Sequence, residues 1–252
     1  MIEIFLLSLI QGITEFLPIS SSSHLIIFSK YISFENQSLS IDISLHIGSF
    51  LAVITYFHKD IISFIKNKNL FLKILTASIP VMFIGFFLIQ TNFIGKLRNI
   101  EVIGWTTLIF GILLYLSDRY KLERNISTNF NYKTAIFVGI FQIFSLVPGV
   151  SRSGITITAA RFLKFKRFDA AKISFLLSIP TLGAVSLFGL KNSFTSEDIN
   201  ISILNLASIF FSYIFSLITI NYFLKYIKNF NLNIFVSYRI ILGLFLLAAA
   251  YL

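Results

Sequence analysis

The sequence predicts an all-α polytopic membrane protein, with six transmembrane helices and two re-entrant helical hairpins in an inverted repeat. Composition, apolar stretches and the placement of basic residues lead to this prediction. Hydrophobic residues make up 56% of the 252 residues, charged residues make up 13%, and the mean hydropathy is +0.84. Soluble domains carry about 25% charged residues, so this chain has too little polar surface to cover a water-soluble protein.

Eight apolar stretches divide the chain: 2–28, 43–57, 70–94, 99–117, 134–160, 173–190, 201–224 and 234–252. A helix of about 20 residues crosses the hydrocarbon core, and six of the stretches are ordinary candidates for spans, although 43–57 is short. The other two, 2–28 and 134–160, are interrupted by proline and polar residues. Interruptions free backbone groups that lipid cannot satisfy, so they predict turns buried in protein or lining a wet cavity.

The basic residues decide the topology. Fifteen of the 21 lysines and arginines lie in four loops: 58–73, 118–133, 161–172 and 225–233. Positive residues near the ends of spans favour the cytoplasm. If 134–160 crossed the membrane, the loops on its two sides would face opposite compartments, so we expect it to enter and leave on one side.

Charge placement also bears on the partners of a chain with net charge +10 and a pI near 9.8. The basic residues form short runs between apolar stretches, as juxtamembrane residues do, so we expect the bilayer as a partner and no nucleic acid. The chain has no cysteine, which excludes disulfides, thiolate metal sites and a cysteine nucleophile.

A broken hairpin followed by three spans occurs twice. We therefore predict one membrane domain over 1–252, with repeat one at about 1–117 and repeat two at about 134–252. Three spans separate the hairpins, and because this number is odd, the second repeat is inverted. Inverted repeats with broken helices place a site where the repeats meet. The two hairpin tips also align, with FLPISS at 16–21 beside LVPGVS at 146–151.

The first hairpin carries polar groups within an apolar segment, in the run QGITEFLPISSSSH at 11–24. An ionisable group at the bilayer centre costs about 3 kcal/mol, so such a group usually acts or pairs. Glu15 and Gln11 share a helix face at i, i+4 spacing and can offer oxygens to Mg²⁺ or Ca²⁺. Pairing of Glu15 with Arg152 for neutralisation is the structural alternative.

The serines and the histidine of this hairpin are candidates for the chemistry. His24 can act as general acid, general base or nucleophile, because imidazole titrates near neutral pH. A lone histidine is more often a structural hydrogen-bonding residue, but its place after four serines favours a function. Ser20 and Ser21 can bind phosphate or attack it, although a water-exposed turn needs serines equally.

The second hairpin carries PGVSRSGIT at 148–156. Its glycines permit positive φ and close approach of a ligand, its hydroxyls donate, and Arg152 has a planar fork suited to phosphate oxygens. A helix that starts near Thr156 would favour an anion at its N-terminus. The predicted phosphate-binding residues are Ser20, Ser151, Arg152, Ser153, Gly154 and Thr156. A small-residue packing motif is the alternative, but it does not explain the arginine.

Other polar residues in apolar surroundings have weaker claims to a function. We expect His46 and Arg239 to make polar packing contacts. His58, beside Lys59 and Asp60, is typical of a membrane interface.

The motifs at 11–24 and 148–156 resemble the two signature motifs of the bacitracin-resistance type undecaprenyl-diphosphate phosphatases. Further similarity at 45–53 and 174–180 extends the resemblance over essentially the whole chain. Gln11 is an accepted variant of the glutamate that can begin the first motif. Ser23 stands where the family usually has glycine, which affects the local backbone of the turn.

The resemblance implies hydrolysis of undecaprenyl diphosphate to the monophosphate, which recycles the lipid carrier of peptidoglycan synthesis and confers bacitracin resistance. It also implies a divalent cation, a location in the bacterial inner membrane and a site that opens to the periplasm. The implied functional residues are Glu15, His24, Arg152 and the hairpin serines, among them Ser21. The attacking group is Ser21, His24 or a water, and a homodimer stays open. The alternative function is a transporter or flippase of the prenyl-phosphate carrier, since inverted repeats with broken helices are also typical of transporters.

Overall fold

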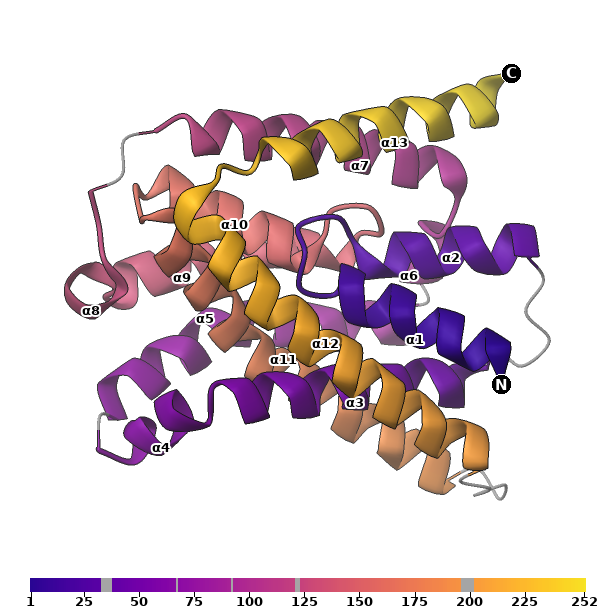
Figure 1. The fold of residues 1–252 in the computed structure, drawn as a ribbon, viewed down its shortest axis with the longest axis horizontal. Coiled ribbons are helices and arrows are strands. Elements are labelled where there is room, and N and C mark those ends of the chain that lie inside the picture. The colour runs from indigo at the N-terminus through magenta and orange to yellow at the C-terminus, as the bar shows by residue number, and fades with distance from the viewer. Residues whose placement is uncertain (33–37, 67, 92, 121–122, 196–201) are drawn as a thin grey trace.

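The computed structural model is a bundle of helices and describes residues 1–32, 38–66, 68–91, 93–120, 123–195 and 202–252 (Figure 1). Among these residues, six helices are long and apolar enough to cross a membrane, which confirms the predicted number. They are α3 (Leu39–Tyr56), α5 (Lys68–Gln90), α7 (Ile100–Asp118), α11 (Arg167–Thr195), α12 (Ile203–Asn229) and α13 (Asn233–Tyr251). Three short helices lie between spans: α4 (His58–Lys66), α6 (Phe93–Lys96) and α8 (Ile126–Asn129).

The first span is longer than the apolar stretch that predicts it. α3 begins at Leu39 because Ser38 caps it, with the Ser38 hydroxyl accepting the N–H of Ile41 at 3.3 Å. Asp42 lies in the first turn, where the positive end of the helix dipole favours a carboxylate. Polar residues at 38–42 therefore belong to the helix end, and the short stretch at 43–57 is a span of normal length.

Two pairs of short helices occupy the interrupted stretches: α1 (Ile2–Thr14) with α2 (Ser21–Ile32), and α9 (Tyr132–Gln142) with α10 (Arg152–Phe162). A single 3-10 turn, η1 (Ile143–Leu146), follows α9. Each pair packs as a hairpin, and in Figure 1 the two hairpins extend from opposite ends of the bundle so that their turns meet in the middle. Their re-entrant placement in a bilayer stays a prediction.

The packing of the helices follows the pattern that an inverted repeat requires. α1 of the first half packs against α12 of the second half, and α9 of the second half packs against α5 of the first half. The remaining first-half spans pair with their counterparts, α3 with α11 and α7 with α13. The pairing is thus reciprocal between the two halves, and the bounds of the two repeats stay a prediction.

The four basic loops gather at one end of the bundle, on the left in Figure 1. Lys172 Nζ lies 2.6 Å from Asp60 Oδ1, which joins two of the loops. Asp118, in the loop 118–133, contacts two further loops. Its Oδ1 accepts from Arg167 Nε of 161–172 at 2.8 Å, and its Oδ2 accepts the N–H of Leu232 of 225–233 at 3.2 Å. Residues 67 and 121–122 of these loops lie outside the described residues.

Both ends of the interrupted stretch 134–160 lie at this basic end. α9 starts there and α10 returns there, where Arg161 donates to Asp118 Oδ1 at 3.1 Å from a fully buried position. The hairpin thus leaves and re-enters the same end of the bundle, in agreement with the argument from charge.

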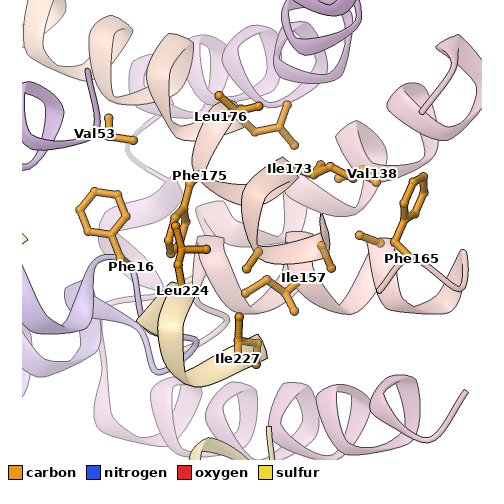
Figure 2. Packing of buried hydrophobic residues seen from close by; sticks show 14 of the residues in the cluster. Phe16, Val53, Val138, Ile157, Phe165, Ile173, Phe175, Leu176, Leu224 and Ile227 are labelled. Atoms are coloured by element: carbon orange, nitrogen blue, oxygen red, sulfur yellow. The ribbon is translucent and has the colours of Figure 1, made fainter. Parts of the chain in front are cut away.

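An apolar cluster holds the tip of the first hairpin against α11 and α12 (Figure 2). Phe16, next to Glu15, is fully buried and meets Phe175 edge to face, with ring centroids 5.3 Å apart. Large apolar side chains such as Phe83 and Leu187 instead lie on the outside, 63% and 71% exposed. Because lipid is as apolar as these side chains, the inner cluster stabilises by close packing rather than by exclusion of water.

We predict that residues 118–133 and 161–172 both face the cytoplasm, because the structure joins them at the basic end. Cysteines introduced at Asn125 and Lys166 should both be protected from a membrane-impermeant thiol reagent in intact cells and labelled after permeabilisation. Labelling of one position and protection of the other in intact cells would mean that 134–160 crosses the membrane.

Candidate active site

The turns of the two hairpins are joined through their backbone carbonyls. Ser153, in the second hairpin, donates its hydroxyl to the carbonyl of Leu17 in the first at 2.7 Å. The guanidinium of Arg239, from α13, donates to both turns, reaching Pro18 O at 3.2 Å and Gly149 O at 2.9 Å. These are carbonyls that the helix breaks leave without helical partners, so the contacts satisfy them and set the spacing of the turns.

Arg239 itself is fully buried. It also donates to Val150 O at 3.0 Å and Thr107 O at 3.2 Å, so its charge is surrounded by four carbonyl oxygens. Within the described chain, no carboxylate forms an ion pair with it. The expected polar packing contact at Arg239 is present, and its extent exceeds the prediction because it bridges both hairpins.

The two turns are equivalent, but their register differs from the sequence alignment by one residue. Ser20 and Ser151 both have positive φ, 77° and 70°, and each directly precedes the second helix of its hairpin. The sequence alignment makes Ser21 equivalent to Ser151, whereas in the structure Ser21 is equivalent to Arg152, the first residue of α10. The second turn holds one more residue, and Gly149 accommodates it with φ of 94°.

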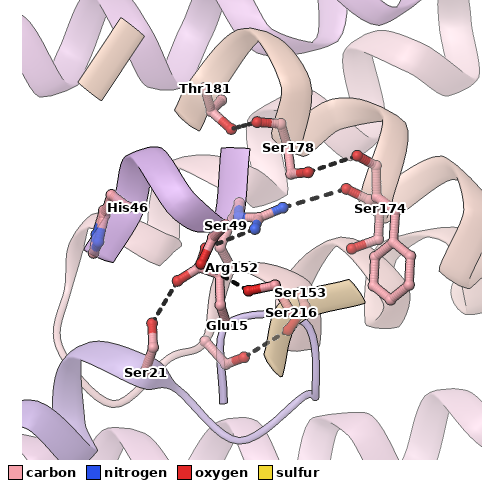
Figure 3. Close-up of polar contacts among 12 residues, drawn as sticks. Glu15, Ser21, His46, Ser49, Arg152, Ser153, Ser174, Ser178, Thr181 and Ser216 are labelled. Atoms are coloured by element: carbon pink, nitrogen blue, oxygen red, sulfur yellow. Dashed lines mark hydrogen bonds and ion pairs between the residues drawn. The ribbon is translucent and has the colours of Figure 1, made fainter. Parts of the chain in front are cut away.

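Glu15 is the centre of the site and is 8% exposed (Figure 3). Its Oε1 accepts from Arg152 Nη2 at 2.7 Å. Its Oε2 accepts from Ser21 Oγ at 2.7 Å and from Gln11 Nε2 at 3.1 Å. One carboxylate therefore takes donors from the first residues of both α2 and α10. The predicted cluster of Glu15, Ser21 and Arg152 is assembled by contact between the two repeats.

Arg152 is held in a fixed orientation. Its side chain is 12% exposed, and its Nη1 donates to the carbonyl of Ser174 in α11 at 3.4 Å while its Nη2 bonds Glu15. Arg152 also starts α10, so its charge adds to the positive end of the helix dipole. The site thus collects positive potential around a single carboxylate.

The other predicted phosphate-binding hydroxyls all form hydrogen bonds with the protein itself. Ser20 Oγ lies 3.0 Å from Ser23 Oγ, and Ser151 Oγ accepts the N–H of Gly154 at 3.1 Å, which caps α10. Thr156 donates to Ser174 Oγ at 2.7 Å. These groups shape the loops that present Ser21 and Arg152.

His24 lies apart from the Glu15 cluster, one turn further along α2. Its Nδ1 is 2.6 Å from the carbonyl of Ser20, and its Nε2 is 2.5 Å from the hydroxyl of Tyr238. The two rings are nearly parallel, 13° apart, with centroids separated by 5.8 Å. Both ring nitrogens are therefore engaged outside the Glu15 cluster.

Two residues at the site are ones that sequence reasoning undervalued. His46, expected to be only a packing contact, has its Nδ1 3.1 Å from Gln11 Nε2 and so borders the site. Tyr238 is not among the predicted site residues, yet its hydroxyl contacts His24 Nε2. A histidine within an apolar span is a signal that could have promoted His46, whereas a tyrosine there resembles an interface residue and carries no such signal.

Glu15 and Gln11 form the donor set that could hold a divalent cation. Gln11 Oε1 is buried and has no hydrogen-bond partner among the described residues, and Gln11 Nε2 bonds the Glu15 carboxylate. Two oxygen-bearing side chains thus meet with one oxygen unsatisfied, which suits a hard cation. Among the same residues, no group of three histidine, aspartate or glutamate side chains gathers to hold a metal. Any cation here would take most of its ligands from substrate and water.

Comparison with known proteins identifies the family. Residues 4–245 match the family described as "Bacitracin resistance protein BacA". The chain belongs to the BacA family. The match covers both hairpins, five spans and most of α13, in agreement with the resemblance seen in the two motifs.

Two relatives of this BacA-family chain are similar over nearly their whole length. A protein of Pelagibacter ubique (strain HTCC1062) is 47% identical over 251 residues, covering 99% of this chain and 98% of the relative. A protein of Jannaschia sp. (strain CCS1) is 39% identical over 262 residues, covering 98% of each chain. Both relatives are named undecaprenyl-diphosphatase.

We predict that Gly149→Ala strongly destabilises this BacA-family protein. A Cβ at Gly149 would overlap Thr106 Oγ1 and lie 2.9 Å from the carbonyl of Ile103, in a backbone with positive φ. Strain and overlap together should cost about 2–4 kcal/mol of unfolding free energy, seen as a lower unfolding temperature in detergent micelles. Gly85→Ala in α5 is the control, because its Cβ would meet only the flexible end of Leu146. Equal unfolding temperatures for both variants would contradict the tight turn.

Proposed function

We propose that this chain hydrolyses undecaprenyl diphosphate to undecaprenyl phosphate and inorganic phosphate. The names of the two full-length relatives support this substrate. The observation that carries the proposal is the convergence of Arg152 and Ser21 on Glu15, where the turns of the two hairpins meet. Phosphoryl transfer needs mainly charge neutralisation and positioning, and this arrangement supplies both.

The diphosphate would bind where the two helix N-termini converge. Arg152 starts α10 and Ser21 starts α2, so each helix presents its positive end and one side-chain donor to the same point. A guanidinium has five donors in a rigid fork, and the bonds from Arg152 to Glu15 and Ser174 orient that fork. Charge-assisted bonds from arginine to phosphate oxygens are about twice as strong as neutral ones.

Glu15 prepares Ser21 for a role in the reaction. The Ser21 hydroxyl hydrogen points to Glu15 Oε2, so the oxygen lone pairs point away from the carboxylate. A phosphorus atom on that side would meet the oxygen rather than the hydrogen. This geometry favours Ser21 over Ser20, whose hydroxyl bonds Ser22 and Ser23 within the turn. Attack by Ser21 and attack by a water near it both fit this arrangement.

We also propose that a divalent cation, Mg²⁺ or Ca²⁺, binds at Glu15 and Gln11. The unsatisfied Oε1 of Gln11 beside the Glu15 carboxylate supports this site. When bound, such an ion would offset negative charge on the diphosphate. Glu15 would hold it with Oε2, while Oε1 keeps its bond to Arg152.

The location follows from the same architecture. The basic end of the bundle would face the cytoplasm of a bacterial inner membrane, and the first hairpin enters from the opposite end. Ser21 and the exposed Ser22 lie at its turn, so the site would open to the periplasm. Assembly as a homodimer stays a prediction.

The rival proposal is a transporter or flippase of the prenyl-phosphate carrier, which the paired hairpins would also suit. A binding site for phosphate needs donors but no carboxylate holding a serine hydroxyl. The Ser21–Glu15 contact at 2.7 Å therefore favours hydrolysis.

We predict that the purified protein releases one phosphate from each undecaprenyl diphosphate, and that Arg152→Lys lowers kcat/KM tenfold to hundredfold. Lysine keeps the charge but cannot bond Glu15 and a phosphate with one planar fork, and one lost charge-assisted bond costs about 1.5–3 kcal/mol. Arg98→Lys, at an exposed position, is the matched control and should leave the rate unchanged. Lipid translocation without phosphate release by the wild type would favour the transporter.

We predict that Gln11→Glu makes the activity more dependent on the cation and lowers the half-saturating Mg²⁺ or Ca²⁺ concentration about tenfold. The added carboxylate would lie against Glu15, so the two charges repel without a cation and bind one more tightly together. Activity at saturating cation should be retained. Gln90→Glu, at the exposed end of α5, is the control. An unchanged half-saturating concentration in Gln11→Glu would place the cation elsewhere.

A further inference from the structure

The hydrogen-bond partners of His24 determine which of its ring nitrogens carries the hydrogen. A carbonyl oxygen can only accept a hydrogen bond, so the contact of 2.6 Å from His24 Nδ1 to Ser20 O places a hydrogen on Nδ1. In the neutral ring, Nε2 then carries the lone pair. Tyr238 must donate its hydroxyl hydrogen to that nitrogen across the 2.5 Å contact. The tautomer is thus assigned from the two partners.

The rings of His24 and Tyr238 differ in how much of their surface is exposed. His24 is 8% exposed, whereas Tyr238 is 41% exposed. Because one imidazole nitrogen is bonded to the backbone and the other to tyrosine, His24 offers no ring nitrogen to a substrate. The Tyr238 hydroxyl can still bond a further group, since a phenolic oxygen accepts a hydrogen bond while it donates one.

Two contacts fix the position of Tyr238 relative to the site, one made by its neighbour Arg239 and one made by its own hydroxyl to His24. The next residue, Arg239, bonds the carbonyls of both hairpin turns, so α13 is held against the turns at this point. His24 follows Ser21 by three residues on α2, and residues at this spacing lie on one side of a helix. Tyr238 therefore reaches the same side of α2 that presents Ser21.

We propose that the Tyr238 hydroxyl relays a proton between the attacking water and His24. The inference rests on the proposed hydrolysis and names a residue that the site description did not assign to the chemistry. Hydrolysis consumes one water whether Ser21 attacks first or not, so a water must lose a proton in either route. His24 Nε2 is the base that receives it, and Tyr238 is the group that touches the water.

The water oxygen forms a bond to phosphorus, its proton moves to Tyr238 Oη, and the Tyr238 proton moves to His24 Nε2. The bond from phosphorus to the leaving oxygen breaks, and the electron pair stays on that oxygen. The leaving oxygen is the bridging oxygen of the diphosphate, or Ser21 Oγ if Ser21 attacked first. The imidazolium then returns its proton through Tyr238 to the leaving oxygen or to solvent.

The test compares Tyr238→Phe, His24→Ala and the double variant in the phosphate-release assay. Removal of a general base costs about 100-fold or more, so we expect each single variant to lose about 100-fold in kcat with KM nearly unchanged. The double variant should be no more than about twofold slower than the slower single variant, because residues acting as a unit are not additive. Tyr222→Phe, at a position 67% exposed in α12, is the matched control.

Three results would overturn the relay: a wild-type kcat in Tyr238→Phe, a change in KM alone, or losses that multiply in the double variant. If Tyr238→Phe does not fold, ring-fluorinated tyrosine at position 238 keeps the hydroxyl and changes its acidity. The relay then requires kcat to change in order with the number of fluorines, and an unchanged kcat would overturn it. Absence of phosphate release by the wild type would instead overturn the proposed function, and the relay with it.

Discussion

The hydrogen bonds from Arg239 to the carbonyls of both hairpin turns are the contacts on which the rest of the site depends. An interrupted helix leaves carbonyls that lipid cannot satisfy, and each costs several kcal/mol if it stays unpaired. Arg239 supplies donors to three of these carbonyls and to one in α7. One side chain therefore stabilises both breaks. Their separation sets where Glu15 meets Arg152.

The Glu15 carboxylate divides its two oxygens between the repeats. Oε1 faces Arg152 of the second hairpin, and Oε2 faces Ser21 and Gln11 of the first. The proposed cation at Gln11 would therefore use a different oxygen from the ion pair with Arg152, and the two would not exclude each other. A buried ion pair contributes little net stability once desolvation is counted. Its value here is that it fixes the positions of both charges before substrate arrives.

Much of the fold could be predicted because it follows from length and charge. Apolar stretches near span length predict six helices, and the basic loops predict that 134–160 returns to its starting side. The expectation that a site lies where inverted repeats meet brings Glu15, Ser21 and Arg152 to one place. These inferences need no knowledge of side-chain packing.

The remainder depends on three-dimensional contacts that no local pattern contains. The register of the turns differs by one residue because Gly149 adopts positive φ against Thr106, and a short alignment cannot detect one added residue. Likewise, His24 and Tyr238 are 214 residues apart and meet only because Arg239 fixes α13 against the turns. The predicted phosphate ligands Ser20 and Ser151 lie in the turns, as expected, but they bond their own loops.

The gathering of basic loops at one end of the bundle also matters while the chain is being made. The two hairpins enter from opposite ends, so their turns meet only if the second half inserts with the opposite orientation to the first. In a chain whose second half was inserted upside down, both hairpins would enter from the same side and their turns would not face each other, so Glu15 would not reach Arg152. By the positive-inside rule, lysines and arginines far from the turns would thus decide, during biosynthesis, whether Glu15 meets Arg152.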